Sequence, residues 1–205
     1  MRAALGCKLH TGWAMLAALT GQPGEIQVLL RRRVELLPLD GSVPRFVYHQ
    51  AAELSLPQAT ALVNRARDAA RKAARLAVED ALHELDSLGA KAAVCGVLGG
   101  SAAVPDDLSR ILRSHPLIHA AEGALFQEAV VSACESCGLA VTTAREREVW
   151  PRAATAWGLD EPVLRKKVDA VRTAVGAPWS ADLKTATAVA LLALKPANKP
   201  VTASG

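Results

Sequence analysis

The stretch AALGCKLHTGWAMLAAL, residues 3–19, predicts a first and central β-strand. Its side chains alternate between two faces, as they do along a strand. One face, which begins Ala4-x-Gly6, is small almost throughout, so a helix can pack closely on it. Lys8 and His10 lie in the middle of this face, where burying a charge is costly unless it is paired. We therefore expect either that this end of the strand opens into a cleft, or that the strand ends near Leu9 and residues 10–12 form a turn.

Further strands are predicted by alternation or by short apolar runs bounded by turn residues. They are Glu25–Leu37, Arg45–His49, Ala90–Leu98 and Leu139–Ala144. The turn signal at residues 21–24 predicts that the strand of residues 3–19 and Glu25–Leu37 form an antiparallel hairpin. Ala90–Leu98 is apolar on both faces, which suits a central parallel strand covered by helices. The glycines that follow it, Gly99-Gly100, would open the carboxyl edge of the sheet, where ligands of open α/β folds usually bind.

The predicted helices are bounded by capping residues, prolines and glycines. They are Pro57–Leu88, Asp106–Arg113, a helix capped by Ser114 that ends near Cys137, Trp150–Trp157, Glu161–Val175 and Ala181–Leu194. The first is long enough that we expect a bend or break. Residues 145–148 are expected to form a solvated loop. Cys134-x-x-Cys137 is half a zinc site without a second pair, so we expect ordinary thiols.

Composition bounds the class of protein. The chain has 205 residues, of which 51% are hydrophobic and 21% charged, enough apolar material for a real core. We expect one domain over residues 1–194 and a frayed tail over 195–205. A net charge of +4 makes nucleic acid worth considering. We find no convincing targeting segment or membrane-length apolar run, and four cysteines do not suggest a disulfide scaffold. The expectation is a cytoplasmic protein without a membrane partner.

A histidine motif stands out in SHPLIHAAEG, which begins at Ser114. His115 and His119 are four residues apart and Glu122 follows three later, so all three share one helical face. Such a face can bind a divalent metal or perform acid–base chemistry. It departs from the zincin pattern, because no Glu directly follows the first His. The alternative is structural: His115 caps the helix, and His119 lies at the edge of the core, bonded to Glu122.

Arginines form two candidate basic surfaces. Arg67, Arg71 and Arg75 recur every four residues on the long helix, which predicts a basic stripe. The stripe is read either as a nucleic-acid surface or as a solvated helix face diluted by nearby acids. Residues 31–33 are three consecutive arginines on a strand, and they cannot all face one ligand. A solvated edge is therefore favoured there over phosphate contact.

The predicted order of elements indicates a mixed sheet, an antiparallel hairpin followed by parallel strands, with helices on both faces and a helical C-terminal third. This order resembles the ribonuclease H-like superfamily, including the Holliday-junction resolvases. Thr11-Gly12-Trp13-Ala14 is similar to the T-G-W/Y segment of the resolvase first strand. SADLKTATAVALLAL, Ser180–Leu194, is similar to their last helix, which carries an Asp in an Ala-rich run. The chain also resembles an uncharacterised bacterial family in which HTGWA, HPxIHxAEG and WxxDxK recur.

The resemblance implies an α/β ribonuclease H-like fold in which the first and fourth strands are neighbours, so Cys7 and Cys95 should lie on adjacent strands. It also implies two metals held by acidic residues, one of them on the first strand. Counting back from Thr11, that position falls at Leu5, and Gly99-Gly100 supplies no carboxylate. Asp182 is the motif-matched carboxylate that remains. Two-metal cleavage needs several such anions, so a standard nuclease site is not expected.

Two functions stay open. The first is an enzyme, a hydrolase with a non-standard site at the carboxyl edge of the sheet and a divalent metal as its candidate cofactor. Its candidate catalytic residues are His10, His115, His119, Glu122 and Asp182, with Lys8, Thr11 and Lys184 as candidate binding residues. The second is a non-catalytic ribonuclease H-like module that binds nucleic acid, a nucleotide or a protein through Arg67, Arg71 and Arg75. Neither function predicts an oligomeric state.

Overall fold

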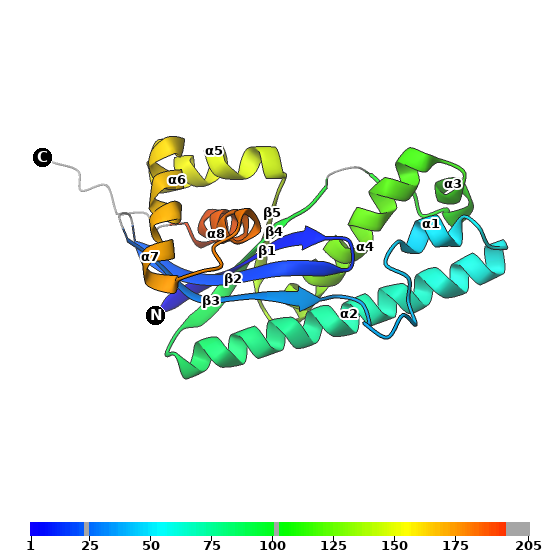
Figure 1. Cartoon of the computed structure of the whole chain (residues 1–205), viewed down its shortest axis with the longest axis horizontal. Coiled ribbons are helices and arrows are strands. Elements are labelled where there is room, and N and C mark those ends of the chain that lie inside the picture. The colour runs from blue at the N-terminus through cyan, green and yellow to red at the C-terminus, as the bar shows by residue number, and fades with distance from the viewer. Residues whose placement is uncertain (23–24, 101–102, 196–205) are drawn as a thin grey trace, which may run out of the picture.

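A computed structural model describes residues 1–22, 25–100 and 103–195 of the chain. Five strands form one sheet in the order β3-β2-β1-β4-β5 (Figure 1). They are β1 (Arg2–His10), β2 (Trp13–Gln22), β3 (Glu25–Glu35), β4 (Lys91–Leu98) and β5 (Ala140–Ala144). The first three are antiparallel, whereas β4 runs parallel to β1 and β5 parallel to β4. The expected mixed sheet is confirmed.

The opening stretch is two strands joined by a tight turn. Thr11 and Gly12 form the turn, and His10 pairs with Trp13 across it. Gly12 has a φ of 82°, a conformation that glycine adopts without steric cost. The predicted turn is confirmed at residues 11–12, and the strand before it also borders a pocket, as the other alternative expected. The predicted hairpin with residues 25–37 is formed by the second half of the stretch, β2, and its predicted turn includes residues 23–24, which lie outside the described residues.

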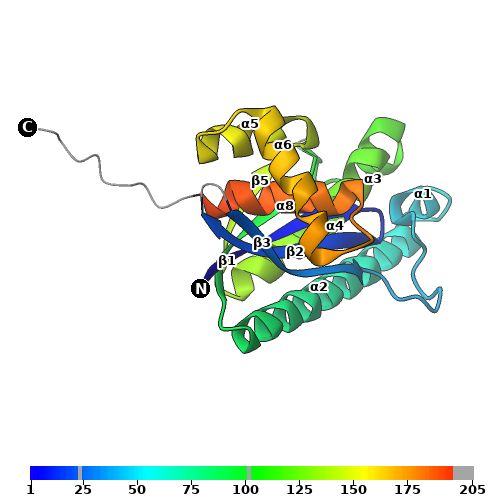
Figure 2. The same cartoon turned by 60° about the vertical axis from the view of Figure 1, so that its left-hand side comes forward.

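Helices cover both faces of the sheet (Figures 1 and 2). Odd-numbered residues of β1, such as Leu5, share a core with α2 (Leu56–Ser87) and α4 (His115–Ser136). Even-numbered residues face α8 (Ala181–Leu194), outside which lie α5 (Glu146–Trp157) and α6 (Glu161–Ala170). A Cβ on Gly6 would lie 2.1 Å from the backbone oxygen of Ala186, so only glycine lets α8 come this close. The small face of β1 does accept a closely packed helix, as expected.

The neighbourhood of β1 and β4 confirms the predicted strand order. Leu5 pairs with Cys95 and Cys7 pairs with Val97, so the two cysteines lie on adjacent parallel strands. Cys95 also meets Cys134 of α4. Hydrogen bonding to Cys134 and Cys7, together with burial, raises the pKa of the Cys95 thiol well above its ordinary value. All four cysteines are free.

Three predictions of local structure are wrong. Residues 45–49 are not a strand; they lead into the short helix α1 (Val47–Ala51), whose first N–H groups bond to the distant Glu122 carboxylate. Residues 145–148 are not a loop but form the start of α5. Glu146 and Glu148 lie in its first turn, where negative charge stabilises the positive end of the helix dipole. Residues 161–175 are divided between α6 and α7 (Arg172–Val175).

The helices α2 and α3 (Leu108–Leu112) differ greatly in length. The long helix α2 runs over 32 residues without the break that its length suggested. The short helix α3 is capped by Asp107. Figure 1 shows α1 and α3 beside the first turns of α4, at one end of the molecule beyond the strand ends. Within the described residues, no helix combines the length and the apolar character needed to cross a membrane. The predicted tail lies, apart from Lys195, outside these residues.

Candidate functional site

A pocket of about 310 Å³ opens at the carboxyl ends of β1 and β4. We call it the sheet-edge pocket. It is lined by Lys8, Leu9, His10, Thr11, Leu98, Gly99, Gly100, Gly123, Phe126 and Glu146. This is the edge where the sequence places the ligand site, and three of the candidate residues, Lys8, His10 and Thr11, line it.

The charged groups of the sheet-edge pocket are paired. Lys8, whose side chain is 12% exposed, forms an ion pair with Glu146 at the start of α5. His10 Nε2 lies 3.1 Å from an Asp182 carboxylate oxygen in the first turn of α8, in an ion pair that is not aligned as a hydrogen bond. His10 also stacks on Trp13, with ring centroids 4.0 Å apart. These pairs explain how charges are tolerated on the small face of β1.

Two other candidate binding residues have structural partners. Lys184 contacts Asp169 of α6 at 2.8 Å. The backbone oxygen of Thr11 accepts a hydrogen bond of 3.0 Å from Arg45 Nε, which ties the β1–β2 turn to the segment before α1.

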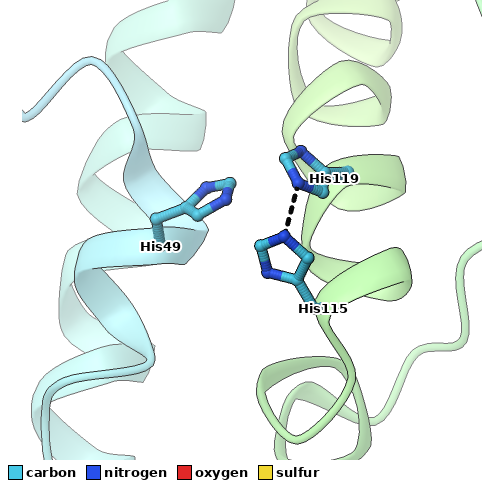
Figure 3. A group of neighbouring side chains, drawn as sticks. All are labelled: His49, His115 and His119. Atoms are coloured by element: carbon cyan, nitrogen blue, oxygen red, sulfur yellow. Dashed lines mark hydrogen bonds between the residues drawn. The ribbon is translucent and has the colours of Figure 1, made fainter.

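A second group, the histidine cluster, consists of His49, His115 and His119 (Figure 3). His115 and His119 lie on successive turns of α4, with their Nε2 atoms 2.9 Å apart. His49 reaches them from α1, and one candidate ligand atom from each residue lies within 4.8 Å of the others. The rings face one another across the gap between the two helices, as Figure 3 shows.

Glu122 joins the histidine cluster to the start of α1. Glu122 is 4% exposed, and its carboxylate accepts backbone hydrogen bonds from Val47, Tyr48 and His49 at the start of α1. One of its oxygens also lies 3.1 Å from His49 Nδ1. The alternative in which His119 bonds to Glu122 is wrong, because the carboxylate bonds to α1 instead.

The five candidate catalytic residues therefore form two groups. His10 and Asp182 meet on the face covered by α8, because even-numbered residues of β1 point there. His115, His119 and Glu122 belong to α4, which covers the opposite face. His49 was missed by the sequence analysis. Nothing in RFVYHQ marks it, since its partners are about seventy residues away in the chain.

The basic stripe on α2 is largely committed to intramolecular contacts. Arg67 is half-buried and donates to the Tyr48 hydroxyl at 3.2 Å, and burial raises the pKa of that phenol. Arg75 pairs with Glu79 at 2.7 Å, whereas Arg71 is exposed. On β3, Arg31 bonds to backbone oxygens at the end of α7, including Gly176 O at 3.3 Å. These contacts favour structural roles over phosphate contact for most of these arginines.

A basic group that the sequence analysis missed lies directly after β5. Arg145, Arg147 and Arg152 surround the single carboxylate of Glu148 at 3.6, 3.7 and 3.9 Å. Three positive charges against one negative leave two uncompensated. We call this group the α5 arginines. The second acid of this segment, Glu146, is paired with Lys8 and does not contact these arginines.

The sheet edge does not fit the two metals that the ribonuclease H-like resemblance implies. No Asp or Glu lies on β1 or in residues 98–100. Glu146 is paired with Lys8, and Asp182 lies beside the imidazole of His10. Two metal ions need several anionic oxygens held close together. The residues present therefore do not provide such a site.

Comparisons with known proteins bear on the fold alone. No protein-family model matches the chain. No curated protein matches it either. Among solved structures, it is similar to Thermus thermophilus RuvC in complex with a Holliday junction substrate, with a TM-score of 0.51 and 14% identity over 94% of this chain and 92% of that one. A second Thermus thermophilus RuvC structure has a TM-score of 0.49, with 13% identity over 93% and 92% of the two chains. The predicted ribonuclease H-like fold is confirmed.

Proposed function

We propose that this protein is a ribonuclease H-like module that binds nucleic acid at the carboxyl edge of its sheet without two-metal cleavage. The observation that carries the proposal is that cations lie at this edge while the positions expected to hold metal-binding acids carry Leu5 and Gly99-Gly100. Lys8 lines the sheet-edge pocket, and the α5 arginines follow β5. Backbone phosphates are attracted by such groups, whereas the metals of a nuclease are not.

The α5 arginines suit phosphate contact better than the stripe on α2. Their side chains are 44%, 75% and 46% exposed, and their distances to Glu148 are loose for ion pairs. A phosphate can therefore approach at little cost, because exposed pairs of this kind contribute little to stability. On α2, by contrast, Arg67 must first leave Tyr48 before it can contact a ligand.

The kind of nucleic acid is suggested by the fold. The structurally similar RuvC was solved in complex with a Holliday junction substrate. Four-way DNA is therefore the first ligand to test, beside duplex and single-stranded DNA of the same sequence. The four tryptophans, one tyrosine and two phenylalanines of the chain offer few stacking platforms, so single strands should bind least well.

The test is fluorescence anisotropy of each labelled DNA at several salt concentrations. We expect binding that weakens steeply with salt, with a slope reduced by about 0.9 for each phosphate contact removed. Arg147→Glu should weaken binding about tenfold. Arg71→Glu is the matched control, a charge reversal at another exposed arginine, on α2, and should leave binding nearly unchanged. Absence of binding at low salt, or a loss confined to Arg71→Glu, would contradict the proposal.

One observation favours a second candidate, a hydrolase centred on His10. Its imidazole lines the sheet-edge pocket and is paired with the Asp182 carboxylate, and a carboxylate can orient a histidine for acid–base work. This candidate predicts cleavage of bound DNA that needs no divalent ion and is abolished by His10→Ala. The module proposed above predicts no cleavage by the wild-type protein under any of these conditions.

A further inference from the structure

We propose that His49, His115 and His119 form a mononuclear site for a divalent transition metal of the zinc class. This site is separate from the sheet-edge pocket and does not depend on the proposed nucleic-acid binding. Imidazole nitrogens are ligands that zinc, copper, nickel and cobalt accept readily, whereas magnesium and calcium prefer oxygen. The histidine cluster offers three imidazoles, and the group contains no carboxylate ligand.

The first support is the position of the rings. His115 and His119 hold their Nε2 atoms 2.9 Å apart, which requires a lone pair on at least one of them to face the other ring. Two nitrogens bound to one tetrahedral zinc at about 2.0 Å are separated by roughly 3.3 Å. Small rotations of two exposed side chains on α4 are therefore enough to turn the hydrogen-bonded pair into two ligands.

The second support is the orientation of His49. A carboxylate only accepts hydrogen bonds, so the contact of Glu122 with His49 Nδ1 places the proton on that nitrogen. The other nitrogen, Nε2, then carries a lone pair. A carboxylate behind a histidine is the usual outer partner of a metal ligand, because it fixes the tautomer and the ring direction.

The third support is that Glu122 itself is held rigidly. It is 4% exposed and accepts three backbone N–H groups of α1, so it cannot swing to another role without leaving those donors unpaired. The same carboxylate thus joins α1 to α4 and aims His49 at the two histidines of α4. Figure 3 shows the resulting arrangement, with His49 on one helix and the pair on the other.

Exposure decides the character of the site. His115 and His119 are exposed and His49 is partly buried, so a bound ion would keep contact with solvent. Three protein ligands leave a coordination position for water or another molecule, which is the arrangement of reactive rather than closed structural zinc sites. A metal there would also link α1 to α4.

The experiment uses full-length protein without a histidine tag, purified without chelator. Metal content is measured by mass spectrometry, and affinity by titration of metal-stripped protein with Co²⁺, whose visible absorption reports tetrahedral nitrogen ligation. We expect one equivalent of metal per chain and competition by Zn²⁺ but not by Mg²⁺. His49→Ala, His115→Ala and His119→Ala should each weaken binding more than about 100-fold, beyond the range of outer-partner effects.

His83→Ala is the matched control, since it removes an exposed histidine of α2 outside the cluster and should leave the affinity unchanged. Glu122→Gln keeps all three ligands and should weaken binding about 10- to 100-fold. Circular dichroism shows whether each variant is folded. We expect the His115 and His119 variants to fold, because both side chains are exposed. A wild-type protein without a cobalt band, or one whose binding survives His119→Ala, would overturn the proposal.

Discussion

The sheet-edge pocket and the histidine cluster differ in how their polar groups are satisfied. In the pocket Lys8 forms an ion pair with Glu146, and His10 lies beside the Asp182 carboxylate. In the histidine cluster the Glu122 carboxylate contacts His49 alone, whereas His115 and His119 contact each other. The carboxylates at the edge of the sheet are thus engaged with Lys8 and His10, whereas the three histidines that could hold a metal ion lie on the opposite face. Likeness of fold does not by itself locate the chemistry of a chain.

The largest expected effect tests what places Asp182 beside the pocket. Gly6→Ala would put a methyl group 2.1 Å from the backbone oxygen of Ala186, so α8 must move away from the sheet. We expect a loss of about 3 kcal/mol of the free energy of unfolding or more, measured by urea denaturation. Gly123→Ala is the control, because its added Cβ would meet nothing within 4 Å. It should be neutral or stabilising by up to about 1 kcal/mol, as for glycine in a helix.

Gly6→Ala also tests whether the sheet-edge pocket and the histidine cluster are independent of each other. Gly6 contacts α8, whereas the histidine cluster lies on α1 and α4. Folded Gly6→Ala protein should therefore retain its cobalt absorption band. Loss of metal binding in this variant, with the fold intact, would show that the two regions are coupled.

The next effect concerns Glu122. Glu122→Ala removes a buried carboxylate and leaves the first N–H groups of α1 without their acceptor. We expect the free energy of unfolding to fall by about 2 kcal/mol, since unsatisfied buried donors cost roughly 1–3 kcal/mol. Chemical denaturation measures it, with Glu128→Ala, an exposed glutamate of the same helix, as the control. Equal stability of the two variants would mean that α1 is held by its apolar contacts alone.

The smallest effect concerns Asp182. Asp182→Asn removes a negative charge from the first turn of α8 and from the contact with His10. The side chains of Asp182 and His10 are each 31% exposed. A half-exposed pair and a helix-end charge contribute at most about 1 kcal/mol each, so we expect a small loss of stability. DNA binding in the anisotropy assay should be unchanged or tighter, because a negative charge is lost. A strong loss of binding or of cleavage would make the pocket, rather than the α5 arginines, the functional centre.

Local signals explain which elements were predicted well. The last helix was bounded correctly, because Ser180 caps it by accepting from the Leu183 N–H and the segment is apolar throughout. The central strand β4 was recognised from its continuous apolar run. By contrast, Tyr48 and Phe46 suggested a strand where α1 forms, because the acceptor for its N–H groups comes from Glu122, over seventy residues away.

The sequence by itself determined that the sheet is mixed and flanked by helices, that one face of β1 is small enough for a closely packed helix, and that His115 and His119 share one face of α4. These features depend on periodicity and residue size, which are properties of neighbouring residues. Only the tertiary structure decided that His10 and Asp182 lie on one face of the sheet and the histidines on the other, and that His49 completes their cluster. The physical reason is that side-chain direction along a strand and contacts between distant segments depend on which face each helix covers.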